Sequence, residues 1–227
     1  MPRARLATFD CYGTLIDWDG GVAAFLYSLA LREGDSEAPN GRALGERWEE
    51  LQFELVTGPY KPYKQILAES LAAFAAERGY TVTDADEKAL VRSMRSWQPF
   101  PDTLPALTRV REAGMKLAII SNSDRDIIEH SLRHLRVPFD DVIVAEDCGA
   151  YKPSDDVFRQ ALERFGEDPA DILHVAFGFK YDIAAAQRAG CRTAWVNRYV
   201  ESAPGEEKPD FEWRDLWGLA DYAESGE

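Results

Sequence analysis

Hydrophobic and polar residues follow two different patterns along this chain. From residue 103 onward, short apolar runs alternate with amphipathic stretches that have a helical period. The run at 116–121 is apolar on consecutive positions, which is typical of a strand buried on both faces. After Pro153, the residues Val157, Phe158 and Ala161 share one helical face. The pattern therefore predicts repeated β-α units with right-handed crossovers.

The predicted strands are short, and the helices between them cover 9 to 12 residues in most cases (about three turns). Strands are expected at 6–9, 116–121, 142–145, 172–176 and 192–196. Helices are expected at 104–112, 124–135, around 157–165 and at 182–189, with a charged loop at 201–209 and a terminal helix at 215–223.

Residues 19–98 show four helical patterns and no convincing strand. These patterns cover 22–31, 43–55, 63–78 and 85–97, and glycine-rich and proline-rich joints flank the block at Asp19-Gly20-Gly21 and Gln98-Pro99-Phe100-Pro101. We therefore expect an α/β protein with two parts. A Rossmann-like parallel-sheet core is formed by 1–18 and 99–227, and an all-helical cap by the inserted segment 19–98.

Composition narrows the classes of partner. Forty acidic residues against 26 basic ones give a net charge of -14, which disfavours nucleic acids and anionic membranes. No apolar run reaches the roughly 20 residues of a membrane span, and the N-terminal residues lack the apolar region of a signal peptide. Three scattered cysteines fit a reducing cytoplasm. An anionic small-molecule substrate needs a locally positive pocket, and the sequence leaves a homodimer open.

Polar residues stand at the carboxyl ends of the predicted strands, where open parallel sheets bind ligands. They are Asp10, the pair Ser121 and Asn122, Lys152, and Asp182. Asp10 is the predicted nucleophile, and Lys152 would keep its carboxylate ionised and oriented. Backbone N–H groups of residues 11–13, together with Ser121 or Asn122, are expected to face an anion.

These motifs resemble those of the haloacid dehalogenase superfamily. The ordered motifs are Phe9-Asp10-x-Tyr12-Gly13-Thr14-Leu15, Ile120-Ser121-Asn122, Tyr151-Lys152-Pro153 and Asp182, and the resemblance covers essentially the whole chain. Within that superfamily, the helical cap and Tyr12 are similar to those of the L-2-haloacid dehalogenases. The resemblance implies hydrolysis of a short 2-haloacid to a 2-hydroxy acid and halide through an ester on Asp10.

The resemblance also implies a role for each site residue. Asp10, Thr14, Lys152 and Asp182 form the catalytic group, in which Thr14 steadies the nucleophile and water attacks near Asp182 and Lys152. Ser121 is expected to hold the substrate carboxylate. The remaining residues of the expected substrate pocket are Cys11, Tyr12, Tyr63, Asn122 and Tyr181.

Phosphatases of the superfamily remain the closest alternative, and a catalytically silent binding module is a second one. A phosphatase has an aspartate two residues after the nucleophile, whereas this chain has Tyr12, a poor acid at neutral pH. A phosphatase also has a second acidic residue, close to the one that corresponds to Asp182, with which it binds Mg²⁺. This chain has Phe177 or Gly178 at that place. We therefore expect no metal and no cofactor, with Mg²⁺ required only if the protein is a phosphatase.

The chain departs from the dehalogenase pattern in its polar contacts. The family's cap arginine, which follows a tryptophan, corresponds here to Glu49 after Trp48, and a tyrosine and two polar residues correspond to Phe158, Phe177 and Phe179. The sequence offers four candidate replacement cations, namely Arg47, Lys61, Lys64 and Lys180. Arg47 lies one residue, or about 100° of helix rotation, from the family's position.

Overall fold

A six-stranded parallel sheet forms the centre of the computed structural model, which describes residues 3–225. The strands are β1 (Leu6–Phe9), β2 (Lys116–Ser121), β3 (Asp141–Val144), β4 (Ile172–Ala176), β5 (Arg192–Val196) and β6 (Phe211–Trp213). Their order is β3-β2-β1-β4-β5-β6, and every neighbouring pair is parallel. The predicted α/β fold is confirmed. Because the chain winds outward from β1 in both directions, β1 and β4 meet at the switch point where such sheets bind ligands.

Alternate side chains of each strand face opposite layers of helices, as the pleat requires. In β2, Leu117 and Ile119 pack in the core that also contains α5 (Thr103–Glu112), α6 (Arg125–Leu135) and α10 (Trp217–Ser225). Ala118 and Ile120 pack instead against α8 (Asp155–Phe165) and α9 (Phe179–Arg188). Each fully buried leucine or isoleucine stabilises the fold by about 1.5–3 kcal/mol. The uninterrupted apolar runs in the sequence follow from this burial on both faces.

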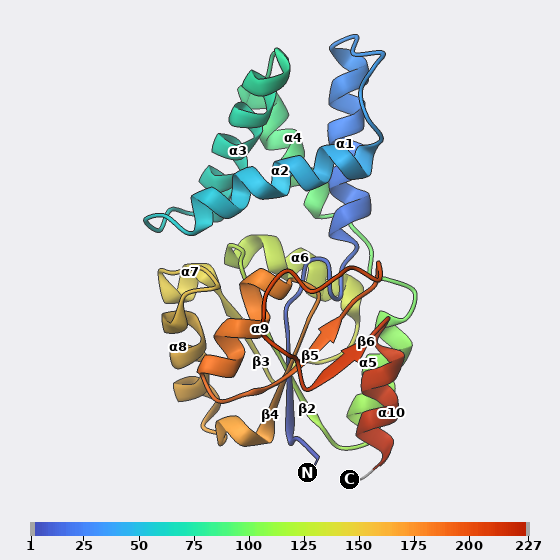
Figure 1. Cartoon of the computed structure of the whole chain (residues 1–227), viewed down its shortest axis with the longest axis vertical. Helices are drawn as coiled ribbons and strands as arrows, with labels where there is room; N and C mark the ends of the chain where they lie inside the picture. Colours follow the sequence, from blue (N-terminus) through green and yellow to red (C-terminus); the bar gives the residue numbers. More distant parts are fainter. Residues whose placement is uncertain (1–2, 226–227) are drawn as a thin grey trace.

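Four helices stand over the carboxyl edge of the sheet (Figure 1). They are α1 (Trp18–Arg32), α2 (Gly41–Val56), α3 (Tyr63–Arg78) and α4 (Asp84–Met94). Local signals set their ends: Asn40 caps α2 with its side chain, and Thr83 and Asp86 form a capping box at the start of α4. The α4 helix ends three residues before its predicted end, where Trp97 packs edge to face against Tyr12.

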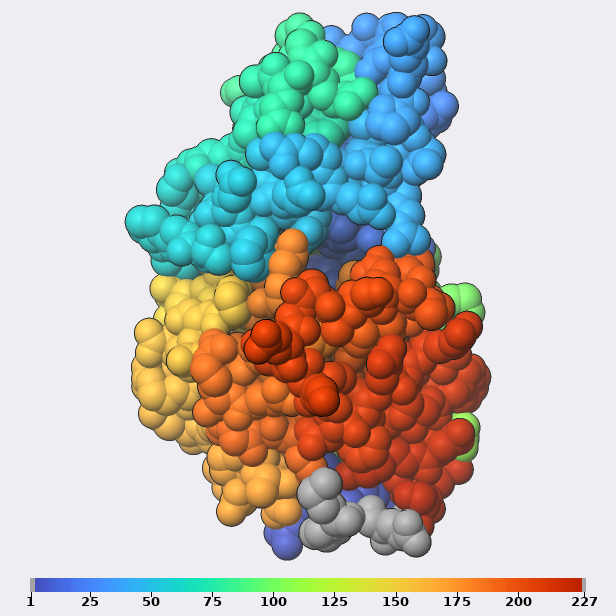
Figure 2. Space-filling model, viewed as in Figure 1, coloured from blue at the N-terminus to red at the C-terminus, as the bar shows by residue number. Residues whose placement is uncertain are grey.

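The two chain segments that join the helical layer to the sheet run side by side. Asp17 N donates to the carbonyl of Gln98 at 2.9 Å, and Phe100 N donates to the carbonyl of Leu15 at 3.1 Å. Farther along the edge, the carboxylate of Asp124, at the start of α6, accepts from the first amides of α3, Tyr63 N and Lys64 N, at 2.8 and 3.1 Å. Between these contacts, the surface is hollowed (Figure 2).

Several further elements differ from the sequence prediction. The pattern did not reveal β6, a three-residue strand next to charged residues, or the single turn α7 (Ala145–Cys148). The α9 helix begins at Phe179, not at Asp182, because Gly178 is its N-cap. Asp182 therefore lies in the first helical turn and does not cap the helix. The terminal helix α10 starts two residues later than predicted. None of the helices described in residues 3–225 has the length and hydropathy needed to cross a membrane.

Candidate active site

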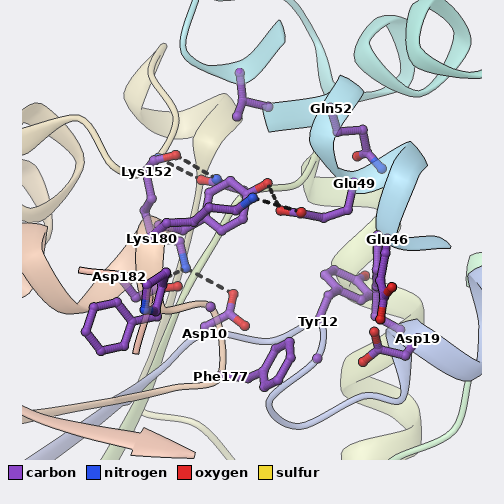
Figure 3. Close-up of a pocket in the computed structure, with 18 of the residues that line it drawn as sticks. Asp10, Tyr12, Asp19, Glu46, Glu49, Gln52, Lys152, Phe177, Lys180 and Asp182 are labelled. Atoms are coloured by element: carbon purple, nitrogen blue, oxygen red, sulfur yellow. Dashed lines mark hydrogen bonds and ion pairs between the residues drawn. The ribbon is translucent and has the colours of Figure 1, made fainter. Parts of the chain in front are cut away.

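The carboxyl ends of β1, β2 and β4 bring the predicted polar residues together at one edge of the sheet. Asp10 directly follows β1, Ser121 ends β2, and Asp182 lies in α9 after β4. Lys152 follows α7 and extends its side chain back into this group (Figure 3). The convergence that the sequence predicted from strand ends is therefore present in the fold.

The ammonium of Lys152 is the centre of the group. Its Nζ donates to Asp10 Oδ1 at 3.0 Å, to Asp182 Oδ1 at 2.6 Å and to the carbonyl of Ile120 at 2.9 Å. These three bonds use all three ammonium hydrogens of a side chain that is only 1% exposed. The two carboxylates outweigh the effect of burial and raise the pKa of Lys152. Lys152 therefore remains a cation across the neutral range and fixes both carboxylates.

Asp10 is held through both of its oxygens. Thr14 Oγ1 donates to Asp10 Oδ2 at 2.8 Å and accepts from the amide of Phe177 at 2.8 Å. Burial raises the pKa of Asp10, against the opposing attraction of Lys152, and the nearby charge of Asp182 adds to the rise. Gly13 adopts the positive φ of +90° in the turn after the nucleophile, which glycine allows without strain.

Asp182 has a second buried partner, His174. His174 Nε2 lies 2.9 Å from Asp182 Oδ1, and its Nδ1 lies 2.9 Å from Thr8 Oγ1 on the neighbouring strand. Lys152 and His174 together lower the pKa of Asp182 although burial opposes them. Sequence reasoning assigned His174 no role. The available signal was a polar residue inside the otherwise apolar strand Ile172–Ala176. The ring of Phe158 packs edge to face on His174 at 5.0 Å.

Asn122 and Gly13 do not offer the anion contacts that the sequence predicted. The Asn122 amide accepts from Lys152 N at 2.8 Å and donates to the Lys152 carbonyl at 3.0 Å, so it clamps the backbone of the lysine. The Gly13 N–H donates to the carbonyl of Ile16 at 2.8 Å. Ser121 lines the cavity above Asp10, and its Oγ lies 3.2 Å from Ser123 Oγ. Asn122 and Gly13 also line the cavity, but Ser121 is the one of the three whose donor is not bonded to a backbone carbonyl.

A cavity of about 480 Å³ lies between this edge of the sheet and the helical layer. The rings of Tyr12, Tyr63 and Tyr181 line it, as expected for pocket walls. Their hydroxyls bond to protein groups: Tyr12 to Ser131 Oγ at 2.9 Å, Tyr63 to Gln52 Oε1 at 3.0 Å and Tyr181 to Glu49 Oε1 at 2.6 Å. Burial raises the pKa of all three phenols.

Cys11 was predicted to belong to the substrate pocket, but its side chain points elsewhere. It is fully buried in the apolar core and is not among the residues that line the cavity. Burial raises the pKa of this thiol well above its usual value. The residue therefore packs as a small apolar group.

Each of the four candidate replacement cations is paired with a carboxylate. Lys180, the one that lines the cavity, donates to Glu49 Oε2 at 2.9 Å. The other three pairs are Arg47 with Glu50 and Glu77, Lys61 with Glu69, and Lys64 with Asp126. The residue after Trp48 has thus changed sign, and its negative charge neutralises the nearest lysine.

The donor set does not fit Mg²⁺. Asp10 and Asp182 share the Lys152 ammonium, and Phe177 and Gly178 stand between β4 and α9, where a second carboxylate would be needed. Within residues 3–225, no group of three or more His, Cys, Asp or Glu side chains is arranged to hold a metal ion.

The chain is similar to proteins of known activity over most of its length. The family model of haloacid dehalogenase-like hydrolases matches residues 4–190. The (S)-2-haloacid dehalogenase of Pseudomonas fluorescens is 29% identical over 205 residues, which are 87% of this chain and 86% of that protein. A second (S)-2-haloacid dehalogenase, H-109 of Pseudomonas putida, is 29% identical over 225 residues, which are 94% of this chain and 95% of that protein.

Structural comparison agrees with the sequence matches. A solved L-2-haloacid dehalogenase superposes with a TM-score of 0.83 at 26% identity, covering 97% of this chain and 99% of that one. A shorter match, 31% identical over 124 residues, is to a glyceraldehyde 3-phosphate phosphatase of Methanopyrus kandleri and covers 51% of this chain and 52% of that protein. Taken with the aspartate at the tip of β1 and its lysine partner, these findings show that the chain belongs to the haloacid dehalogenase-like hydrolases.

Proposed function

We propose that this protein hydrolyses the carbon–halogen bond of a 2-haloacid through an ester on Asp10. The observation that carries the proposal is the surroundings of Asp10. Lys152 holds its carboxylate, and two residues later Tyr12, a partly buried phenol with a raised pKa, is hydrogen-bonded to Ser131. A halide leaves without a proton, whereas the alkoxide of a phosphate ester needs an acid at this position. The names of the relatives support the same substrate class.

In the first step, a carboxylate oxygen of Asp10 attacks the carbon that carries the halogen. A carbon–oxygen bond forms while the carbon–halogen bond breaks, and the bonding electron pair leaves with the halide. Thr14 and Lys152 hold the two Asp10 oxygens, so the attacking group is oriented before the substrate arrives. Ser121 receives the substrate carboxylate on the same side of the cavity.

In the second step, water attacks the carboxyl carbon of Asp10 and releases the 2-hydroxy acid. Asp182 takes up one proton of the water and returns it to the oxygen of the departing 2-hydroxy acid when the Asp10 ester bond breaks. The second proton of the water is released to solvent as Asp10 returns to a carboxylate. Its Oδ1 is occupied by Lys152 and His174, so Oδ2 is the oxygen that would face the water. The lowered pKa of Asp182 keeps this carboxylate ionised at neutral pH. Lys152 stabilises the negative charge that develops on the Asp10 oxygen during the attack.

We propose that no metal takes part in this reaction. The alternative is an Mg²⁺-dependent phosphatase, which the phosphatase from Methanopyrus kandleri makes worth testing. Halide release from 2-chloropropionate that persists in the presence of a strong chelator would support the dehalogenase. Release of phosphate from small phosphate esters, if it requires added Mg²⁺, would contradict the dehalogenase proposal and support the phosphatase.

Mass analysis after turnover in H₂¹⁸O tests the ester route. Water attacks the carboxyl carbon of Asp10, so the heavy oxygen is expected in the peptide that contains Asp10 and not in the product of the first turnover. Asp10→Asn is expected to lower halide release by about 10⁴-fold or more, because the nucleophile is removed. Label found first in the 2-hydroxy acid, or unchanged turnover in Asp10→Asn, would contradict the proposal.

A further inference from the structure

Gln52 has a buried hydrogen-bond donor without a partner at the wall of the cavity. It lies on α2, lines the cavity and is only 5% exposed. Its Oε1 accepts from the hydroxyl of Tyr63 at 3.0 Å, but its Nε2 has no acceptor among the residues that the structure describes. A buried N–H without an acceptor is costly, and one at a cavity wall can gain its partner from a bound ligand.

Neighbouring hydrogen bonds fix the orientation of this amide. The side chain of Trp18 is hydrogen-bonded to the hydroxyl oxygen of Tyr63, and the indole N–H can only donate. The Tyr63 proton is therefore free to be donated to Gln52 Oε1. A flipped Gln52 amide would leave both the Tyr63 proton and the Gln52 oxygen unpaired. The observed orientation, with Nε2 free, satisfies more groups.

The position of Gln52 suits the departing group of the proposed reaction. Asp10 forms the floor of the cavity at the sheet edge, and α2 forms its roof, so the two side chains lie on opposite sides (Figure 3). In a displacement, the leaving atom departs on the side opposite the nucleophile, which here is toward the roof. Two cations that line the cavity near α2 are already paired with carboxylates, Lys180 with Glu49 and Arg42 with Glu46 and Glu201.

Building on the proposed dehalogenation, we propose that Gln52 Nε2 is the cap-side donor that receives the departing halide. The halide would then be contacted by an uncharged amide, because this chain has Glu49 after Trp48, where the family's pattern has an arginine. An uncharged donor stabilises the developing negative charge less than a cation would. We therefore expect turnover to depend strongly on the leaving group and the halide product to be bound weakly.

Two substitutions at Gln52 test this assignment. Gln52→Met keeps the length of the side chain and removes the donor. Gln52→Glu keeps the acceptor for Tyr63 and replaces the donor with a negative charge. Gln65→Met is the matched control, because Gln65 lies on the exposed face of α3 and donates to Glu69.

The first measurement is the kcat of each variant with 2-chloropropionate and 2-bromopropionate. Gln52→Met is expected to lower kcat about 10²-fold with 2-chloropropionate, an effect comparable to removing one donor from an oxyanion hole. The decrease in kcat should be clearly smaller with 2-bromopropionate, because bromide is the better leaving group. Gln52→Glu should lose more, and Gln65→Met should match the unmodified protein. Equal losses for both substrates, or none, would overturn the assignment.

The second measurement is the line width of chloride in chlorine NMR, which reports halide binding without turnover. Broadening by the unmodified protein that disappears in Gln52→Met supports the assignment, and broadening that persists overturns it. If no haloacid is turned over but the broadening still depends on Gln52, the proposed function fails and the halide site stands. If haloacids are turned over and Gln52 has no effect, the proposed function stands and the halide site fails.

Discussion

The floor and the roof of the cavity use charge in opposite ways. On the floor, Asp10 and Asp182 are both bonded to the buried Lys152, and each has a further polar partner. On the roof, the partly exposed Glu49 pairs with Lys180, and Gln52 contributes the free donor. The floor matches the motifs of the family, and the roof departs from them. The comparison suggests that the floor sets the reaction and the roof selects the substrate.

Further acidic side chains line the cavity beyond this pair. Asp19, Glu46 and Glu201 also line the cavity, where Arg42 bonds to Glu46 at 2.8 Å and to Glu201 at 2.9 Å. Burial raises the pKa of Asp19 to about 6. An anionic substrate must therefore enter past negative charge to reach Ser121.

Removing the central cation of the floor should have the largest effect. Lys152→Met leaves two buried carboxylates close together without a counterion, which should lower the free energy of unfolding by about 3–5 kcal/mol. It should also lower kcat by about 10³-fold, because Asp10 is no longer oriented and the second step loses its positive charge.

Urea unfolding and halide release under conditions where the variant remains folded measure the two effects. Lys61→Met is the control, because Lys61 pairs with Glu69 at a side chain that is 36% exposed. That variant should change stability by less than about 1 kcal/mol. A Lys152→Met protein with ordinary stability and activity would show that the floor does not depend on this cation.

His174→Gln should slow the second step more than the first. Loss of the imidazole bond weakens the orientation of Asp182, so we expect kcat to fall by about 10- to 100-fold while the ester on Asp10 accumulates. Intact-protein mass spectrometry after rapid quenching would detect the accumulated ester. Thr8→Val, which removes the far partner of the imidazole, should show a weaker form of the same effect. No accumulation in either variant would limit His174 to a packing role.

Glu49→Gln should improve binding of anionic substrates. It frees Lys180 at the cavity wall, and the gain for a partly exposed charge is about 0.5–1 kcal/mol, which is about two- to fivefold in KM for 2-chloropropionate. Glu69→Gln is the control, since it frees Lys61, which does not line the cavity. A KM that rises in Glu49→Gln would mean that the pair with Lys180 and Tyr181 is needed to shape the roof.

The pH dependence of KM should show the smallest effect. Asp19 is negatively charged above its pKa of about 6 and neutral below it. As the pH falls through this range, the roof loses one negative charge, and KM for an anionic haloacid should decrease about twofold or threefold. Asp19→Asn should remove this dependence and keep the lower KM at neutral pH. Meanwhile, kcat should fall toward acid pH at a higher pH than for an ordinary aspartate, because the pKa of Asp10 is raised.

The fold class and most of the residues on the floor could be predicted from the amino-acid sequence. The strands 6–9, 116–121, 172–176 and 192–196 follow from apolar runs, and parallel strands necessarily bring their carboxyl ends to one edge. Asp10, Ser121 and Asp182 follow from that rule. Lys152 follows from its place in the ordered motifs. Local propensity also marked the four helices above the sheet.

The pairing of the polar side chains could not be predicted and depends on contacts made in the folded chain. Glu49 and Lys180 are 131 residues apart in sequence, and no local pattern shows that they neutralise each other. The bond of His174 to Asp182 depends on strand register, and the free donor of Gln52 depends on a hydrogen bond made by Tyr63 from another helix. Periodicity predicts which face of an element is buried, whereas the partner of a polar group is set by neighbours that only folding brings within about 3 Å.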